Sequence, residues 1–278
     1  MQPIKLGNNM LFNELGRKIP TPECRVFDNA KRNFYKINKP SFDVEKQHIK
    51  ALELKLLDES ITFNSVNAEQ KALYTSINNN PDYQNLLLGT CVPFAVSIHD
   101  LKSDIGEQLE EDFLPLVKKT YEESQNGSWF KATLQGGNAL RNSLNVVEAS
   151  GYKSFLDAVK SHCVVGYYFP TAFQEYDIAS QRNQVNLLPK NEDFSMCLSG
   201  HVEASYSLVM YPDLLFDCKN YSPILCLSAL EHTDQRMVPM FKSYGPHLEF
   251  WLLSQMMTET QTQISEQWSG GLTIYKCL

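Results

Sequence analysis

The chain lacks the features that mark several large classes of protein. Its 278 residues contain no run of about 20 apolar residues, so no membrane-spanning helix is predicted. The N-terminus lacks the continuous apolar segment of a signal peptide. The seven cysteines form no C-x-x-C pair, and their odd number predicts neither a disulfide framework nor a zinc ribbon. Such cysteines fit a reducing compartment, and we expect a cytoplasmic protein unless a specialised bacterial system secretes it.

Positive charge is scarce as well. The formal net charge of −7 argues against general nucleic-acid binding, which depends on Lys and Arg to neutralise phosphates. The first fifty residues are an exception, with ten Lys and Arg against five Asp and Glu. We therefore distinguish a basic irregular arm, residues 1–40, from a body formed by residues 41–278. The arm either packs across the acidic body or contacts a partner such as anionic lipid.

Helical spacing of apolar residues dominates the first 160 residues, and strand-like segments dominate the rest. The predicted helices cover 42–57, 67–77, 103–123 with a kink at Pro115, 139–149, 152–161 and a segment beginning at Gly245-Pro246. The predicted strands cover 91–98, 163–169, 202–210, 223–230 and 272–277, and 181–193 is read as a loop. This segregation predicts a single α+β domain, in which a helical N-terminal part packs on a mixed or antiparallel sheet from the C-terminal half.

Histidines stand beside acids more often than composition suggests. The pairs are His99-Asp100, His201-x-Glu203, His232-x-Asp234 and His247-x-Glu249. Residues two apart point to one side of a strand but diverge on a helix, so the predicted helix excludes the last pair and the predicted strand favours the second. We expect His201, Glu203 and a distant His232 to act in acid–base catalysis or to bind Fe or Zn. The pattern resembles the facial triad of non-haem iron oxygenases. The alternative is a solvated strand face.

Two further segments carry residues of possible chemical use. Cys91 enters a predicted strand eight residues before His99 and is a candidate nucleophile, as is Cys163 beside His162. Buried structural thiols are the alternative for both. The turn Gly136-Gly137-Asn138 with Arg141 offers backbone N–H groups to an anion, or else simply caps a helix.

Two functional classes follow from these patterns. The first is an intracellular enzyme, a hydrolase or oxygenase, that acts on a small molecule through its His/carboxylate site. The second is a non-catalytic interaction protein that uses the basic arm and an aromatic surface. The aromatic segments Tyr167-Tyr168-Phe169-Pro170 and Phe250-Trp251 form either core, the default interpretation, or the wall of an apolar pocket. Convergence of His201, Glu203 and His232 around one cavity would favour the enzyme.

Overall fold

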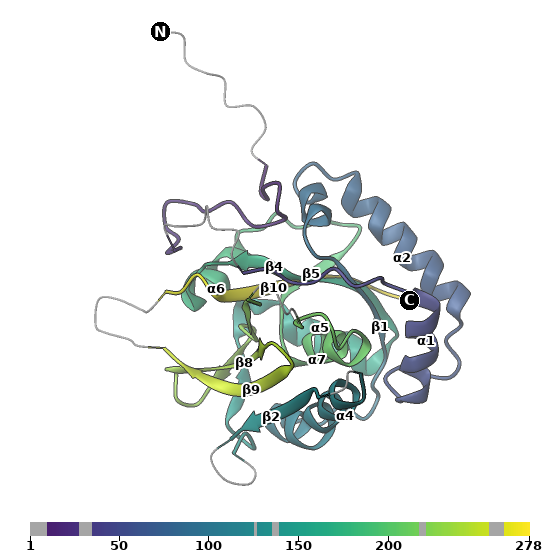
Figure 1. Cartoon of the computed structure of the whole chain (residues 1–278). Coiled ribbons are helices and arrows are strands. Elements are labelled where there is room, and N and C mark those ends of the chain that lie inside the picture. Colours follow the sequence, from purple (N-terminus) through teal and green to yellow (C-terminus); the bar gives the residue numbers. More distant parts are fainter. Residues whose placement is uncertain (1–9, 28–34, 125–126, 135–138, 217–220, 256–263) are drawn as a thin grey trace.

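A mixed sheet of eight strands forms the centre of the molecule in the computed structural model of the chain (Figure 1). The structure describes residues 10–27, 35–124, 127–134, 139–216, 221–255 and 264–278. The strands, including two that form a separate pair, are β1 (Val92–Val96), β2 (Trp129–Thr133), β3 (Leu144–Val146), β4 (Val164–Gln174), β5 (Ser195–Leu198), β6 (Ile224–Cys226), β7 (Leu230–His232), β8 (Met237–Tyr244), β9 (His247–Ser254) and β10 (Trp268–Cys277).

The strand order of the large sheet is β1-β4-β10-β6-β8-β9-β2, and β5 also pairs with β10. Most neighbours are antiparallel, whereas β6 with β10 and β2 with β9 run parallel. Strands β3 and β7 form a small antiparallel pair of their own. Apart from β1 and β2, the large sheet is built from residues after 163, so the predicted α+β architecture is confirmed.

Helices surround the sheet and also lie within its curve. They are α1 (Val44–Glu53), α2 (Phe63–Asn78), α3 (Ile105–Gln108), α4 (Leu114–Ser124), α5 (Tyr152–Ser161), α6 (Ile178–Asn186) and α7 (His201–Met210), with 3-10 turns η1 (Gln84–Leu88) and η3 (Glu148–Ser150) and a π-helical turn η2 (Leu109–Phe113). Within the described residues, no helix is both long and apolar enough to cross a membrane.

Successive residues of a strand point to opposite faces of the sheet. In β4, other elements cover both of these faces. In β4 the hydroxyl of Tyr167 donates to the Gln70 carbonyl of α2 at 3.0 Å. The next residue, Tyr168, is fully buried beside Glu203 of α7. Figure 1 accordingly shows α5 and α7 on the inner side of the curved sheet, with α1 and α2 outside it.

Helix α7 occupies the interior, and the strand predicted for residues 202–210 is wrong. All ten of its residues are buried, and it contacts α4 and η2 as well as β1 and β4. A helix enclosed on every side needs no polar face, so its apolar residues show no period of 3.6. The local feature that favours a helix here is its N-terminal cap. The N–H of Gly200 donates to the Glu203 carboxylate, three residues later, at 2.6 Å.

The segment after Gly245 forms a strand, so the helix predicted there is also wrong. Strands β8 and β9 pair from Met237↔Ser254 to Tyr244↔His247, which leaves Gly245 and Pro246 as a two-residue hairpin turn. Gly245 has φ +61°, a left-handed conformation that glycine adopts without steric cost. Leu248 and Phe250, two residues apart on β9, are both fully buried, which is the period of two expected for a strand with one buried face.

Two other predictions are corrected by tertiary contacts. Residues 139–149 form a turn, β3 and part of η3 instead of a helix, because β3 pairs with β7. The predicted loop 181–193 begins inside α6, whose N-cap Asp177 accepts a hydrogen bond from the Ser180 N–H at 2.7 Å. The proposed anion turn at 136–138 lies outside the described residues.

The helical run from α3 to α4 changes geometry next to its proline. Turn η2 is π-helical and ends just before α4, which carries Pro115 as its second residue. Proline lacks the N–H that an α-helix requires, and a π-turn accommodates the irregular hydrogen bonding. The predicted kink near Pro115 thus takes the form of one wide turn. It lies beside the cavity described below.

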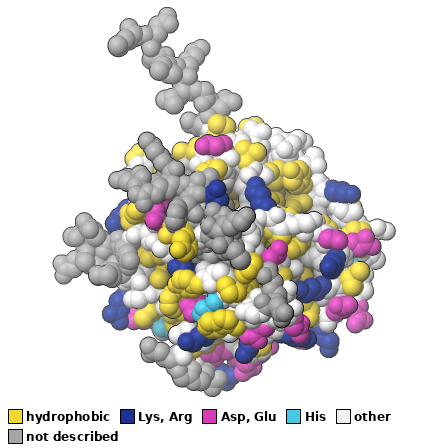
Figure 2. Space-filling model, viewed as in Figure 1, with side chains coloured by type: hydrophobic (Ala, Val, Ile, Leu, Met, Phe, Trp, Pro, Cys, Tyr) yellow, Lys and Arg dark blue, Asp and Glu magenta, His cyan; other side chains and the backbone are white. Residues whose placement is uncertain are grey.

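The basic arm packs against the body in the parts that the structure describes. Phe12 is fully buried, and Tyr35 and Ile37 belong to the core. Arg17 forms a buried ion pair with Glu175, with Nη1 and Oε1 3.1 Å apart. On the face shown in Figure 2, basic and acidic side chains are interspersed among the coloured residues. The arm thereby contributes to the core of the protein.

Candidate functional site

Glu203 lies in the first turn of α7 and has no exposed surface. Its Oε1 accepts hydrogen bonds from the Gly200 N–H at 2.6 Å and the Thr273 hydroxyl at 3.2 Å, while Oε2 has no partner among the described residues. Burial raises the pKa of Glu203 to about 7, because the carboxylate loses its hydration in the interior. Glu203 is therefore an interior group whose charge changes near neutral pH.

His201, the first residue of α7, is a neutral imidazole. Burial lowers its pKa to about 3. Its Nδ1 lies 3.3 Å from the hydroxyl of Tyr152, and that hydroxyl accepts the Val202 N–H at 2.9 Å. The same hydroxyl also faces the Glu203 carboxyl group, so His201 Nδ1 and Glu203 are both placed to accept its proton.

The close approach of Tyr152 to α7 depends on a glycine. A Cβ atom added to Gly200 would overlap the Tyr152 ring. The ring of Phe113 meets His201 from another side, edge to face, with centroids 5.6 Å apart. Packing therefore holds the orientation of the imidazole.

The three predicted metal ligands take separate positions. His201 and Glu203 are two residues apart on a helix and diverge by about 200° around its axis. His232 lies at the end of β7, where its Nδ1 accepts the Asp234 N–H at 2.9 Å. In the described part of the chain, no group of three or more His, Cys, Asp or Glu residues is arranged to hold a metal ion. The resemblance to a facial triad thus gains no support from the geometry.

The pair that the predicted helix excluded does meet in space. His247 and Glu249 share a face of β9, and their Nε2 and Oε1 atoms are 3.2 Å apart. The His247 ring stacks on Trp129 of the parallel strand β2, with centroids 3.2 Å apart. Burial lowers the pKa of His247 despite the nearby Glu249. This cluster belongs to the edge of the sheet.

Cys91 is poorly suited to act as a nucleophile, because burial of its thiol raises its pKa well above the ordinary value. Both ring nitrogens of His99 face other groups. In iodoacetamide labelling followed by peptide mass spectrometry, we expect Cys91 to react about tenfold more slowly than the exposed Cys277. Cys277→Ser provides the control, since it removes the faster site and leaves the slower one. Faster labelling of Cys91 would restore it as a candidate nucleophile.

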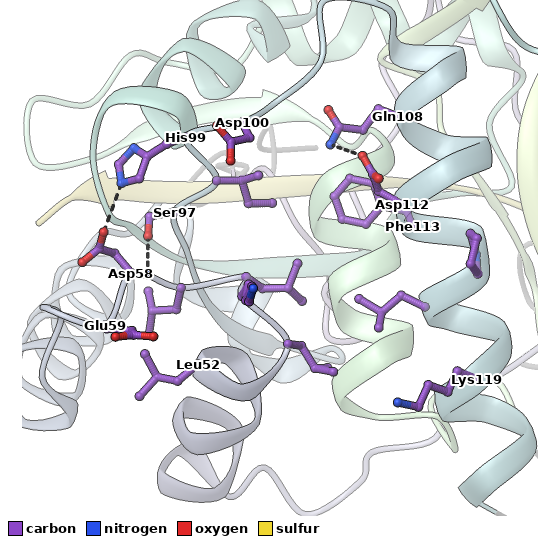
Figure 3. Close-up of a pocket in the computed structure, with 17 residues that line it drawn as sticks. Leu52, Asp58, Glu59, Ser97, His99, Asp100, Gln108, Asp112, Phe113 and Lys119 are labelled. Carbon is purple, nitrogen blue, oxygen red and sulfur yellow. Dashed lines mark hydrogen bonds and ion pairs between the residues drawn. The ribbon is translucent and has the colours of Figure 1, made fainter.

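A cavity of about 660 Å³ lies between the segment after α1, the end of β1 and the helical run η2–α4 (Figure 3). A volume of this size accommodates a small organic molecule. Part of its wall is apolar and consists of Leu52, Leu54, Ile98, Phe113, Pro115 and Leu116. Its polar lining includes Lys55, Asp58, Glu59, Ser97, His99, Asp100, Gln108, Asp112 and Lys119.

His99 pairs with a carboxylate in this cavity, but the partner is Asp58 and not its neighbour Asp100. The Nε2 of His99 lies 3.4 Å from Asp58 Oδ2, and its Nδ1 donates to the Lys160 carbonyl at 3.0 Å. Hydrogen bonds from Ser60, with a smaller contribution from His99, lower the pKa of Asp58. Asp58 also donates its N–H to the Ser97 hydroxyl at 2.8 Å. The His99 ring is thus fixed from both sides.

Negative charge gathers toward one side of the cavity. Figure 3 shows Glu59 and Asp100 on the same side of the cavity as His99, with Lys119 on the opposite side. Glu59 and Asp100 have exposed side chains and no ion-pair partner among the described residues. Asp112, by contrast, accepts from Gln108 at 3.1 Å. Two carboxylates at the rim are therefore available to a cationic group.

Comparison with known proteins gives no functional assignment for the chain. No protein-family model matches the chain, and neither do the curated proteins or the solved structures.

Sequence reasoning missed the cavity because its lining comes from distant segments. His99 attracted attention through its neighbour Asp100, yet the carboxylate that contacts it follows α1. Nothing local in the sequence connects Asp58 with His99. The sequence features that could have pointed to this cavity are the proline and the acidic residues of the predicted helix 103–123, which lines one side of it.

Proposed function

We propose that the protein binds a small amphipathic molecule, an apolar body bearing an amine or guanidine group, in the cavity of Figure 3. The observation that carries this proposal is the apolar wall formed by residues such as Phe113 and Leu116 beneath a rim with two unpaired carboxylates, Glu59 and Asp100. Apolar area would supply affinity, and the carboxylates would select a cation. This role retains the predicted small-molecule ligand but moves it away from His201.

Binding is favoured over catalysis by the orientation of His99. A general base needs a free ring nitrogen within reach of the reacting proton. The Nδ1 hydrogen is directed at the Lys160 carbonyl and Nε2 faces Asp58, so neither nitrogen faces Ser97 as a base would. The His99–Asp58 pair instead fixes one side of the cavity.

The expected strength of the ionic contribution follows from its location. Two unit charges 4 Å apart attract by about 1 kcal/mol in bulk water and by about 4 kcal/mol at the effective dielectric constant of 20 typical near protein surfaces. Because Glu59 and Asp100 are exposed, solvent and salt screen them. We therefore expect binding that weakens as ionic strength rises.

The test compares 2-phenylethylamine with 2-phenylethanol, which has the same ring and chain but no charge. Ligand-observed NMR titration should show binding of the amine and about tenfold weaker binding of the alcohol. The double substitution Glu59→Gln/Asp100→Asn should reduce amine binding to the level of the alcohol. Glu192→Gln, at an exposed carboxylate outside this cavity, should leave it unchanged.

A second variant locates the binding site. Leu116→Trp adds bulk to the apolar wall and should weaken both ligands while circular dichroism shows an intact fold. Equal affinity for amine and alcohol, or amine binding that neither variant changes, would rule out this function for the cavity.

A further inference from the structure

A smaller cavity of about 350 Å³ lies on the other side of Gln108 and is separate from the proposed amine site. Gln108 lines both cavities, and its side chain is fixed, since Oε1 accepts the Lys102 N–H at 2.8 Å and Nε2 donates to Asp112 at 3.1 Å. The walls of the smaller cavity come from the α3 region, β3, α5 and the start of α7. Leu101, Ile105, Leu144 and Leu156 form apolar parts of these walls.

His201 supplies a buried polar atom to this cavity. The residue lines the cavity although it is only 1% exposed. Tyr152 occupies Nδ1 at 3.3 Å, whereas Nε2 makes no hydrogen bond within the described residues. Among the described residues, the ring nitrogen without a partner is thus Nε2 of a neutral imidazole. A ligand that hydrogen-bonds this nitrogen supplies the partner that the protein does not provide.

Two lysines supply positive charge at the mouth of the same cavity. Lys153 and Lys160 lie seven residues apart on α5, which places them on one face two turns apart. Both are exposed, and neither has an ion-pair partner among the described residues. Asp157 lies between them and offsets part of their charge. Lys102, also in the lining, is already paired with Glu111 at 2.6 Å.

We infer that this cavity binds a short organic acid whose carboxylate meets Lys153 and Lys160 and whose uncharged oxygen accepts a hydrogen bond from His201 Nε2. The inference includes the tautomer of His201, with the ring hydrogen on Nε2 and with Nδ1 accepting from the Tyr152 hydroxyl. Solvation determines which end of the cavity holds the carboxylate and which holds the uncharged oxygen. A carboxylate loses least hydration at the exposed lysines, whereas a carbonyl oxygen is cheaper to bury beside a neutral imidazole. The carbon chain between them lies against Leu101, Ile105 and Leu156.

A set of three probes separates the two contacts. 5-Oxohexanoate carries both groups, hexanoate lacks the carbonyl and 2-hexanone lacks the carboxylate. Isothermal titration of the full chain should show 5-oxohexanoate binding about tenfold more tightly than either of the others. His201→Leu should abolish the preference over hexanoate, and Lys153→Gln/Lys160→Gln should abolish the preference over 2-hexanone. Lys118→Gln, at an exposed lysine outside the cavity, should change neither preference.

A spectroscopic measurement keeps the test decisive if the His201 variant does not fold. In the wild-type protein with ¹⁵N-labelled histidine, the His201 signals should identify the Nε2–H tautomer, and 5-oxohexanoate should shift the Nε2 resonance where hexanoate does not. Equal affinities for the three probes in the wild type, or an Nε2 resonance that 5-oxohexanoate leaves in place, would overturn the inference.

Discussion

Replacing Glu203 with glutamine is expected to stabilise the protein at pH 8 by roughly 3 kcal/mol and to change its stability little at pH 5. Burial raises the pKa of Glu203 to about 7 in the folded protein, against an ordinary value of 4.5. Below pH 4.5 the carboxyl group is protonated in both the folded and unfolded states. Between pH 4.5 and 7 only the unfolded state releases the proton, so the stability of the wild type falls as pH rises.

Glutamine removes this pH dependence because it carries no ionisable proton. Its amide oxygen can still accept the hydrogen bonds that Gly200 and Thr273 donate to Oε1. Urea unfolding at pH 5, 6, 7 and 8 measures the free energy of unfolding of both proteins. The difference between them should grow from pH 5 to 7 and then level off. Glu192→Gln is the control at an exposed carboxylate, and a Glu203→Gln curve that stays parallel to the wild type would contradict the prediction.

Replacing Arg17 with methionine is expected to destabilise the protein by about 3–5 kcal/mol, since it leaves the carboxylate of Glu175 buried without its partner. The two side chains are 9% and 5% exposed, and Nη1 and Oε1 lie 3.1 Å apart. Burial lowers the pKa of Arg17 and raises that of Glu175, although each charge favours the ionised form of the other. Desolvation therefore outweighs attraction in both groups, and the pair depends on both members.

A double-mutant cycle separates this effect from lost packing. The variant Arg17→Met/Glu175→Met should be more stable than Arg17→Met alone, because no charge remains buried. Arg141→Met is a matched control, since Arg141 pairs with Glu111 at 2.7 Å on the surface and should cost less than about 1 kcal/mol. If Arg17→Met also lowered the free energy of unfolding by less than about 1 kcal/mol, the prediction would be wrong, and the arm around Arg17 would contribute little to stability.

Predictions from the sequence succeeded where one face of an element is exposed. Helices α1, α2 and α5 each alternate exposed and buried residues around their axis, and their apolar spacing identified them. The buried strand β4 was recognised from its aromatic and β-branched residues. The failures at α7 and β9 have opposite causes. Burial on all sides removed the helical period from α7, and Gly245-Pro246, which suits a helix start, forms a hairpin turn before β9.

The sequence by itself determined the α+β class and helices such as α1, α2 and α5. Only the tertiary structure decided which carboxylate each histidine meets. His99 contacts Asp58 instead of Asp100, and His201 contacts Tyr152 instead of sharing a ligand with Glu203. The physical reason is that adjacent residues of an extended segment and residues two apart on a helix point in different directions, so the partners of His99 and His201 come from distant segments. Burial then decided their charge, leaving His201 neutral and Glu203 poised near pH 7.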